Sequence, residues 1–205
     1  MLADLKITEY LEKAAAGTAV PGGGSVAALT ASLAAGLTEM VANLTIGKKG
    51  YEAVAEEMKD IVEKSAELRE KLTAAIDRDA EAYSDVMKAF KLPRATDAEK
   101  ELRNQEIQKA FKHAALVPLE VANHAVKVID LAARAVNSGN KNAVTDGVVA
   151  AMNARTAALA ALYNVKINLV SIEDDEFVKE LTRKINNLKQ QAKSKEQEIL
   201  ASIVI

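Results

Sequence analysis

The chain has 205 residues, of which 49% are hydrophobic and 27% charged, and its formal net charge is -2. This length and composition suffice for one substantial core, so we predict a single domain over residues 1–205. The near-neutral charge and the 3% aromatic content argue against nucleic-acid binding, and the absence of cysteine excludes disulfides, thiolate catalysis and cysteine-bound metals.

The first predicted helix covers residues 4–16 and ends at Gly17. Its mixed charged and apolar residues do not form the apolar segment of a secretory signal, so we expect a cytoplasmic protein. A second helix follows PGGG with Ser25 as the candidate N-cap. Its apolar stretch, residues 25–46, is built from small residues and contains Glu39, so we interpret it as a buried helix that does not enter a membrane.

A very long helix is predicted over residues 51–92, because neither glycine nor proline interrupts the apolar spacing before Pro93. At 1.5 Å per residue this helix would measure about 60 Å. Such a helix is longer than a globule of this size is wide. We therefore expect a homodimer in which a second subunit covers the additional surface.

Three more helices complete the prediction. TDAE at residues 96–99 is a capping box that opens a helix running to Gly139, which Pro118 kinks or divides. Another helix covers residues 145–169, and the last follows SIED at residues 171–174. The predicted fold is an all-α bundle of about six helices.

The stretch DRDAEAY at residues 77–83 places one aspartate in the apolar seam of the long helix. Continuing the apolar spacing from Ile76 to Tyr83 leads to Asp79, whereas Asp77 falls on the polar face and is expected to be exposed. From spacing alone, a structural carboxylate bonded to a neighbouring helix is the more common explanation for Asp79. Burial without full pairing would instead raise its pKa, as acid–base catalysis requires.

Two loops are candidate ligand sites. PGGGS at residues 21–25 allows close approach of a ligand ahead of a helix N-terminus, although a tight turn with a serine cap explains it equally well. GNKNAVTD at residues 139–146 gathers polar groups, where a glycine stop and an Asx-type cap are the more ordinary explanation. His113 and His124 would lie about 16 Å apart on a helix, so no metal site is expected.

Seven stretches, taken in order, resemble the cyclodeaminase/cyclohydrolase family of tetrahydrofolate enzymes. They are PGGGSVAA, NLTIGKKGY, DRDAEAY, KLPRATDAEK, VPLEVA, GNKNAVTD and YNVKINL. The resemblance spans nearly the whole chain. It includes free-standing methenyltetrahydrofolate cyclohydrolases and the cyclodeaminase half of formiminotransferase-cyclodeaminase, and the lack of a formiminotransferase half here favours the free-standing enzyme.

The resemblance implies an all-helical dimer in which the second aspartate of the D-x-D-A element, here Asp79, is catalytic. It also implies that folate binds near the glycine loop and near the asparagine-rich loop. Two positions depart from the family pattern: Gly50 replaces a lysine, which puts a strong contact with an anionic tail in doubt, and Thr145 replaces a serine but keeps the hydroxyl. The expected substrate-binding residues are Gly22, Gly23, Gly24, Ser25, Lys48, Tyr83, Asn140 and Asp146.

The reaction expected from the resemblance is hydrolysis of 5,10-methenyltetrahydrofolate to 10-formyltetrahydrofolate, with Asp79 as proton carrier. No metal and no cofactor beyond the tetrahydrofolate substrate are expected. In the alternative reaction, 5-formiminotetrahydrofolate closes to a ring and releases ammonia in the same pocket. A third interpretation is an inactive helical interaction protein with a filled pocket, in which Asp79 would be paired with lysine or arginine.

Overall fold

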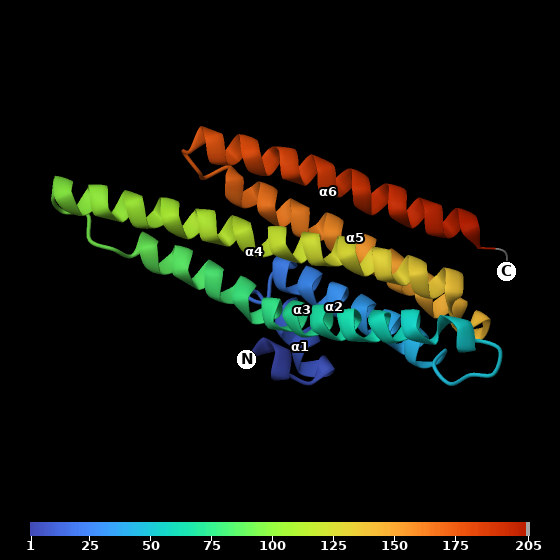
Figure 1. Cartoon of the computed structure of the whole chain (residues 1–205). Helices are drawn as coiled ribbons and strands as arrows, with labels where there is room; N and C mark the ends of the chain where they lie inside the picture. The colour runs from blue at the N-terminus through green and yellow to red at the C-terminus, as the bar shows by residue number, and fades with distance from the viewer. Residues whose placement is uncertain (204–205) are drawn as a thin grey trace.

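The computed structural model describes residues 1–203, which form six α-helices and three short 3₁₀ turns (Figure 1). This part of the chain contains no β-strand, so the predicted all-α fold of about six helices is confirmed. Residues 204 and 205, the last two of the predicted domain, lie outside the described range. The helices are α1 (Ile7–Ala15), α2 (Gly23–Asn43), α3 (Ala55–Phe90), α4 (Asp97–Ser138), α5 (Val144–Leu169) and α6 (Asp175–Ser202).

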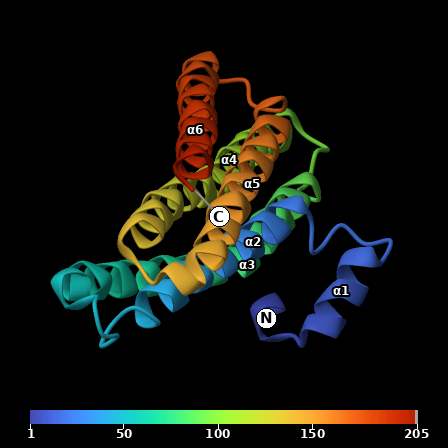
Figure 2. The same cartoon turned by 90° about the vertical axis from the view of Figure 1, so that its right-hand side faces the viewer.

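Helices α2 to α5 form the body of the molecule, and α6 lies along α4 and α5 (Figures 1 and 2). With 36 residues, α3 is about 54 Å long, which agrees with the predicted very long helix. α3 and α4 run antiparallel and project together beyond the N-terminal end of α2 (Figure 1). The start of α2 therefore lies against the middle of α3, where Ser25 bonds to the carbonyl of Ile76.

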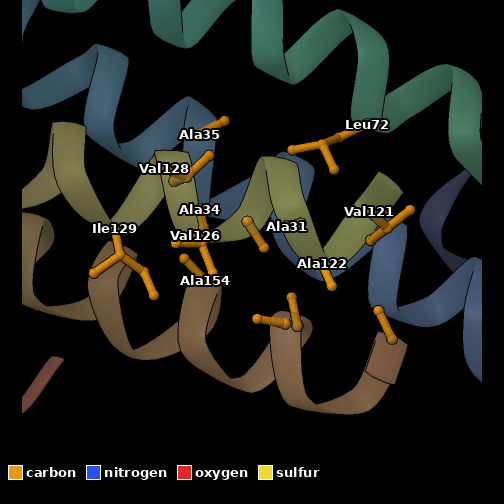
Figure 3. Packing of buried hydrophobic residues seen from close by; sticks show 14 of the residues in the cluster. Ala31, Ala34, Ala35, Leu72, Val121, Ala122, Val126, Val128, Ile129 and Ala154 are labelled. Atoms are coloured by element: carbon orange, nitrogen blue, oxygen red, sulfur yellow. The ribbon is translucent and has the colours of Figure 1, made fainter. Parts of the chain in front are cut away.

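Small side chains on α2 and α5 form the centre of the bundle. Alanine lets two helix axes approach more closely than leucine would. Figure 3 shows Ala31 and Ala34 of α2 and Ala154 of α5 in the same interior as Val121 and Ile129 of α4. By length and composition α2 could also cross a membrane, but its small-residue face is buried in the bundle. This burial agrees with the interpretation of α2 as a core helix.

The helix around Pro118 is not divided, because a neighbouring helix supplies the missing hydrogen-bond donor. Proline has no amide hydrogen to give to the carbonyl of Ala114, four residues earlier. The side-chain amide of Asn168 on α5 donates to this carbonyl at 2.9 Å. α4 therefore continues through the proline for its full 42 residues.

Helix starts were predicted with mixed success. α2 begins after Gly22, and this glycine is the N-cap, so the prediction that Ser25 caps the helix is wrong. The Ser25 hydroxyl instead reaches across to the carbonyl of Ile76 on α3. At the start of α4, Thr96 and Glu99 form the predicted capping box. The difference arises because Ser25 has a partner on another helix, whereas the capping box is satisfied locally.

Candidate active site

A cavity of about 380 Å³ opens where the start of α2 meets α3, α4 and the C-terminal half of α5. Its wall includes the glycine loop, Asp79 and Tyr83 of α3, and Asn164 and Asn168 of α5. Apolar and aromatic side chains, among them Phe90 of α3, form much of the remaining wall. This combination of an apolar wall with a few polar groups is typical of small-molecule sites. The structure thus brings together the predicted catalytic aspartate, the glycine loop and Tyr83.

Asp79 is partly buried and is held by a serine from the facing helix. Its Oδ2 atom lies 3.0 Å from the Ser25 hydroxyl, which is also 2.9 Å from the carbonyl of Ile76. When Asp79 is ionised, Ser25 can donate its single proton to the carboxylate. When Asp79 is protonated, Ser25 can donate to Ile76 and accept from the carboxyl group. Ser25 can therefore support both protonation states of Asp79.

The electrostatic environment of Asp79 favours the protonated form of its carboxyl group more than water would. Burial raises the pKa of the Asp79 carboxyl, while the hydroxyl and the backbone amide of Ser25 oppose this effect. Within residues 1–203, no lysine or arginine forms an ion pair with Asp79. The cavity is also open, so the structure lacks both signs expected for the inactive interaction protein. An unpaired carboxyl with a raised pKa in a cavity is suited to acid–base catalysis.

The glycine loop is shaped by close approach to this carboxylate. A Cβ atom on Gly24 would lie 1.9 Å from Oδ1 of Asp79, so no larger residue fits without displacing the aspartate. A Cβ atom on Gly23 would lie 3.3 Å from the side-chain amide nitrogen of Asn164. The glycines therefore allow α2 to pack against polar side chains of α3 and α5. This packing explains Gly24 without requiring a direct contact with a ligand.

Two asparagines of α5 were not among the predicted site residues. Asn164 donates to the carbonyl of Ala160 at 3.0 Å, and Asn168 donates to the carbonyls of Ala114 and Asn164, both at 2.9 Å. These bonds use the amide nitrogens and leave both amide oxygens without a donor among residues 1–203, and both asparagines line the cavity. The signal in the sequence is the YNVKINL stretch, in which polar residues recur within an otherwise apolar helix.

Three predicted binding residues lie at the opposite end of α2. Lys48 donates to Oδ1 of Asn140 at 2.6 Å, and the backbone amide of Asn140 donates to the Thr45 hydroxyl at 2.8 Å. Asp146 lies in the first turn of α5, near the same end. The 21 residues of α2 span about 32 Å, so one chain does not bring this group to the Asp79 cavity.

Asp77 is not a free surface residue, and this prediction is wrong. Its carboxylate accepts hydrogen bonds from the backbone amides of Leu2 and Ala3, at 2.5 and 3.2 Å. These amides belong to the 3₁₀ turn Leu2–Asp4, whose first donors have no partner within the turn. This turn also explains why the first α-helix begins at Ile7, later than predicted. Asp77 therefore attaches the N-terminal segment to α3.

The described residues contain no group of three or more histidine, aspartate or glutamate side chains placed to hold a metal ion. Glu120, which the sequence places one helical turn before His124, pairs with Arg78 at 2.7 and 3.1 Å. Burial lowers the pKa of His124.

Comparison with known proteins gives consistent matches. Residues 6–187 match the sequence model described as formiminotransferase-cyclodeaminase. A methenyltetrahydrofolate cyclohydrolase of Methylorubrum extorquens is 40% identical over 182 residues, which cover 89% of this chain and 88% of that protein. The formimidoyltransferase-cyclodeaminase of Rattus norvegicus is 31% identical over 98% of this chain, which spans 37% of that longer protein.

A solved structure shares the fold. The crystal structure of formiminotetrahydrofolate cyclodeaminase from Thermotoga maritima superimposes with a TM-score of 0.87 at 33% sequence identity. The match covers 97% of this chain and 96% of that chain. The similarity therefore extends over the whole helical arrangement.

Proposed function

Because the chain belongs to the formiminotransferase-cyclodeaminase family, we propose that it acts in folate one-carbon metabolism and hydrolyses 5,10-methenyltetrahydrofolate to 10-formyltetrahydrofolate. The 40% identity to a cyclohydrolase over nearly the full length of both chains supports this reaction. The observation that carries it is Asp79, a partly buried carboxylate without an ion-pair partner in residues 1–203, placed in an open cavity.

In the proposed mechanism, water adds to the cationic carbon that joins N5 and N10 of the substrate. Asp79 accepts a proton from the attacking water, and a tetrahedral intermediate forms. The bond from carbon to N5 then breaks, N5 takes the proton from Asp79, and the hydroxyl proton leaves as the formyl group forms on N10. One water is consumed and one proton is released, so the cationic substrate gives a neutral reaction centre.

The charge of the substrate fits the state of Asp79. A cation placed beside the carboxylate favours its ionised form and lowers its pKa, which opposes the effect of burial. Asp79 is therefore prepared as a base when substrate binds and becomes a good proton donor once the positive charge has disappeared. Since the carbon is already electrophilic, the proposed reaction needs no metal and no cofactor beyond tetrahydrofolate.

The cavity wall suits a flat heterocycle. Tyr83, Phe90 and Phe111 line the cavity together with Val86 and Met87. Aromatic side chains of this kind bind planar rings by stacking or edge contacts. The amide oxygens of Asn164 and Asn168 add acceptors for ring nitrogen hydrogens.

The alternative reaction is favoured by the structural match to a cyclodeaminase. There N10 of 5-formiminotetrahydrofolate attacks the formimino carbon, and Asp79 would take the N10 proton and give it to the departing nitrogen, which leaves as ammonia. The two reactions are separated by assaying one preparation with both substrates. We expect rapid loss of methenyl absorbance and slow release of ammonia; rapid ammonia release with little loss of methenyl absorbance would assign the cyclodeaminase reaction.

We further propose that the chain is a homodimer in which two α2 helices pair in antiparallel orientation. The outward side of α2 carries side chains spaced alternately by four and three residues, as in a heptad repeat, and Leu33 at its centre is 59% exposed. A two-fold axis near Leu33 would place Lys48 and Asn140 of one subunit beside the Asp79 cavity of the other. The side chains on this outward side of α2 are Val26, Thr30, Leu33, Leu37, Met40 and Leu44.

A further inference from the structure

Helix α1 places one hydroxyl-bearing side chain inside the protein. Tyr10 is 6% exposed and is the only buried residue of α1, whereas Ile7 and Leu11 of the same helix are 80% and 62% exposed. Figure 2 shows α1 standing beside the bundle. Tyr10 lines a small apolar cavity together with Leu29 of α2 and Ile76 of α3. Tyr10 is therefore the main link between α1 and the helices that carry Ser25 and Asp79.

The Tyr10 hydroxyl oxygen is buried and has no hydrogen-bond partner within residues 1–203. A buried, unpaired hydroxyl lowers stability, and phenylalanine would fill the same space without that cost. Packing alone therefore explains the ring of Tyr10 but not its hydroxyl group.

The surroundings of Tyr10 connect it with Asp79. Ile76 lines the same small cavity as Tyr10, and its backbone carbonyl lies 2.9 Å from the Ser25 hydroxyl. Burial and the negative charges of Asp79 and Asp77 raise the pKa of Tyr10, so the phenol keeps its proton at neutral pH. Asp77 is already occupied by the amides of Leu2 and Ala3. Asp79, with Ser25 as its side-chain donor, has acceptor capacity left.

We propose that Tyr10 is a positioning residue for Asp79, whose carboxylate accepts a hydrogen bond from the tyrosine hydroxyl when substrate occupies the cavity. Tyr10 and Ser25 then hold the carboxylate from two sides, so that its proton-accepting oxygen faces the water. The helix α1 can adjust its position, since all of its residues except Tyr10 are exposed or only partly buried. The inference rests on the proposed role of Asp79 in proton transfer.

The test is Tyr10→Phe, which removes the hydroxyl and keeps the ring. We expect kcat to fall about 10-fold with KM little changed, because the contact orients the base and does not bind substrate. The contact forms only with substrate bound, and a carboxylate that loses a donor is harder to ionise, so the acidic limb of the kcat profile should move to higher pH by roughly one unit. The melting temperature should stay the same or rise.

The matched control is Tyr163→Phe, which removes a hydroxyl from an α5 side chain that is 70% exposed. We expect wild-type kcat and an unchanged pH profile for this variant. If Tyr10→Phe also keeps wild-type kcat and pH profile while Asp79→Asn is inactive, the positioning role is wrong and the proposed function stands. If Asp79→Asn is fully active, both are wrong.

A second measurement does not depend on turnover. Titration of the tyrosine Cζ resonances by carbon-13 NMR reports the ionisation of Tyr10, which is identified by its absence in Tyr10→Phe. The negative charge of Asp79 opposes ionisation of Tyr10, so Asp79→Asn should shift the Tyr10 titration to lower pH. An unchanged titration would show that the two groups are not coupled and would overturn the proposal.

Discussion

The two ends of α2 carry polar residues in very different states. At the C-terminal end, Asn140 bonds to Thr45, to the carbonyl of Leu44, to Lys48 and to the amide of Asn142. At the N-terminal end, Asp79 has Ser25 as its side-chain partner and no cation among the described residues. Polar groups whose hydrogen bonds are all made hold neighbouring segments in a fixed geometry. A carboxyl group that lies beside a cavity and has few partners can still accept and donate a proton.

The N-terminal end of α2 should tolerate substitutions less well than the C-terminal end. Gly24→Ala tests this, and we expect it to lower activity more than the changes described below. The new Cβ would lie 1.9 Å from Oδ1 of Asp79, so the carboxylate must turn away from its position. We expect kcat to fall by about 10²-fold or more. The control is Gly36→Ala, whose Cβ meets the Arg69 side chain at an ordinary 3.6 Å. Normal activity in Gly24→Ala would show that the close packing does not matter.

Lys48→Ala tests whether the C-terminal end of α2 in one subunit contributes to the Asp79 cavity of the other subunit. We expect a loss of activity of about 10-fold in the homodimer, since an anionic part of the substrate loses a cation. Mixing this variant with Asp79→Asn subunits should restore about a quarter of wild-type activity, because half of the dimers would each contain one intact site. No recovery, or a monomeric protein by sedimentation, would contradict the proposed pairing.

The pH dependence of stability should distinguish Asp79 from a structural carboxylate. Burial raises the pKa of Asp79 in the folded state, so its stabilising contribution is complete below the unfolded pKa and is lost as pH rises through the folded pKa. Asp79→Asn cannot undergo this loss. From about pH 4 to pH 7, the melting temperature of the variant should therefore rise relative to wild type by a few degrees. A relative decrease would identify Asp79 as a stabilising charge.

Asp77 should give the smallest effect. Asp77→Ala removes the acceptor for the amides of Leu2 and Ala3 and should cost about 1 kcal/mol, similar to the loss of a helix cap. Asp77→Asn keeps an oxygen acceptor and should be closer to wild type in stability and activity. Denaturant unfolding of the two variants checks this difference. Equal stability of Asp77→Ala and wild type would show that the N-terminal turn is not held by this residue.

Much of the fold could be predicted because its determinants are local. Apolar spacing, the Thr96 capping box and the stop at Gly139 indicated the helices, and these features are confirmed. The Ser25 cap was wrong, and of the kink or division expected at Pro118 the division is excluded, because a residue on another helix competes for or replaces a backbone bond. Such partners are not visible in the spacing of a single helix.

The candidate site was predictable only in part for the same reason. The seam position of Asp79 followed from spacing within α3, and the family predicted from seven sequence stretches is confirmed. The cavity also depends on Asn164 and Asn168 of α5. Tyr10 lies near Asp79 but belongs to α1, and no pattern within one helix connects these two residues. The roles of the binding residues, the homodimer, the cytoplasmic location and the absence of a further cofactor stay predictions.

The most direct test of the central claim is the activity of Asp79→Asn on 5,10-methenyltetrahydrofolate, followed by loss of methenyl absorbance beside wild type and Asp77→Asn. Asparagine keeps the volume and an acceptor but cannot carry the proton. We expect kcat to fall on the order of 10²-fold or more with substrate binding little changed, and Asp77→Asn to remain near wild type. Equal kcat in the two variants, with a large loss of stability in Asp79→Asn alone, would contradict the claim and make Asp79 a structural residue.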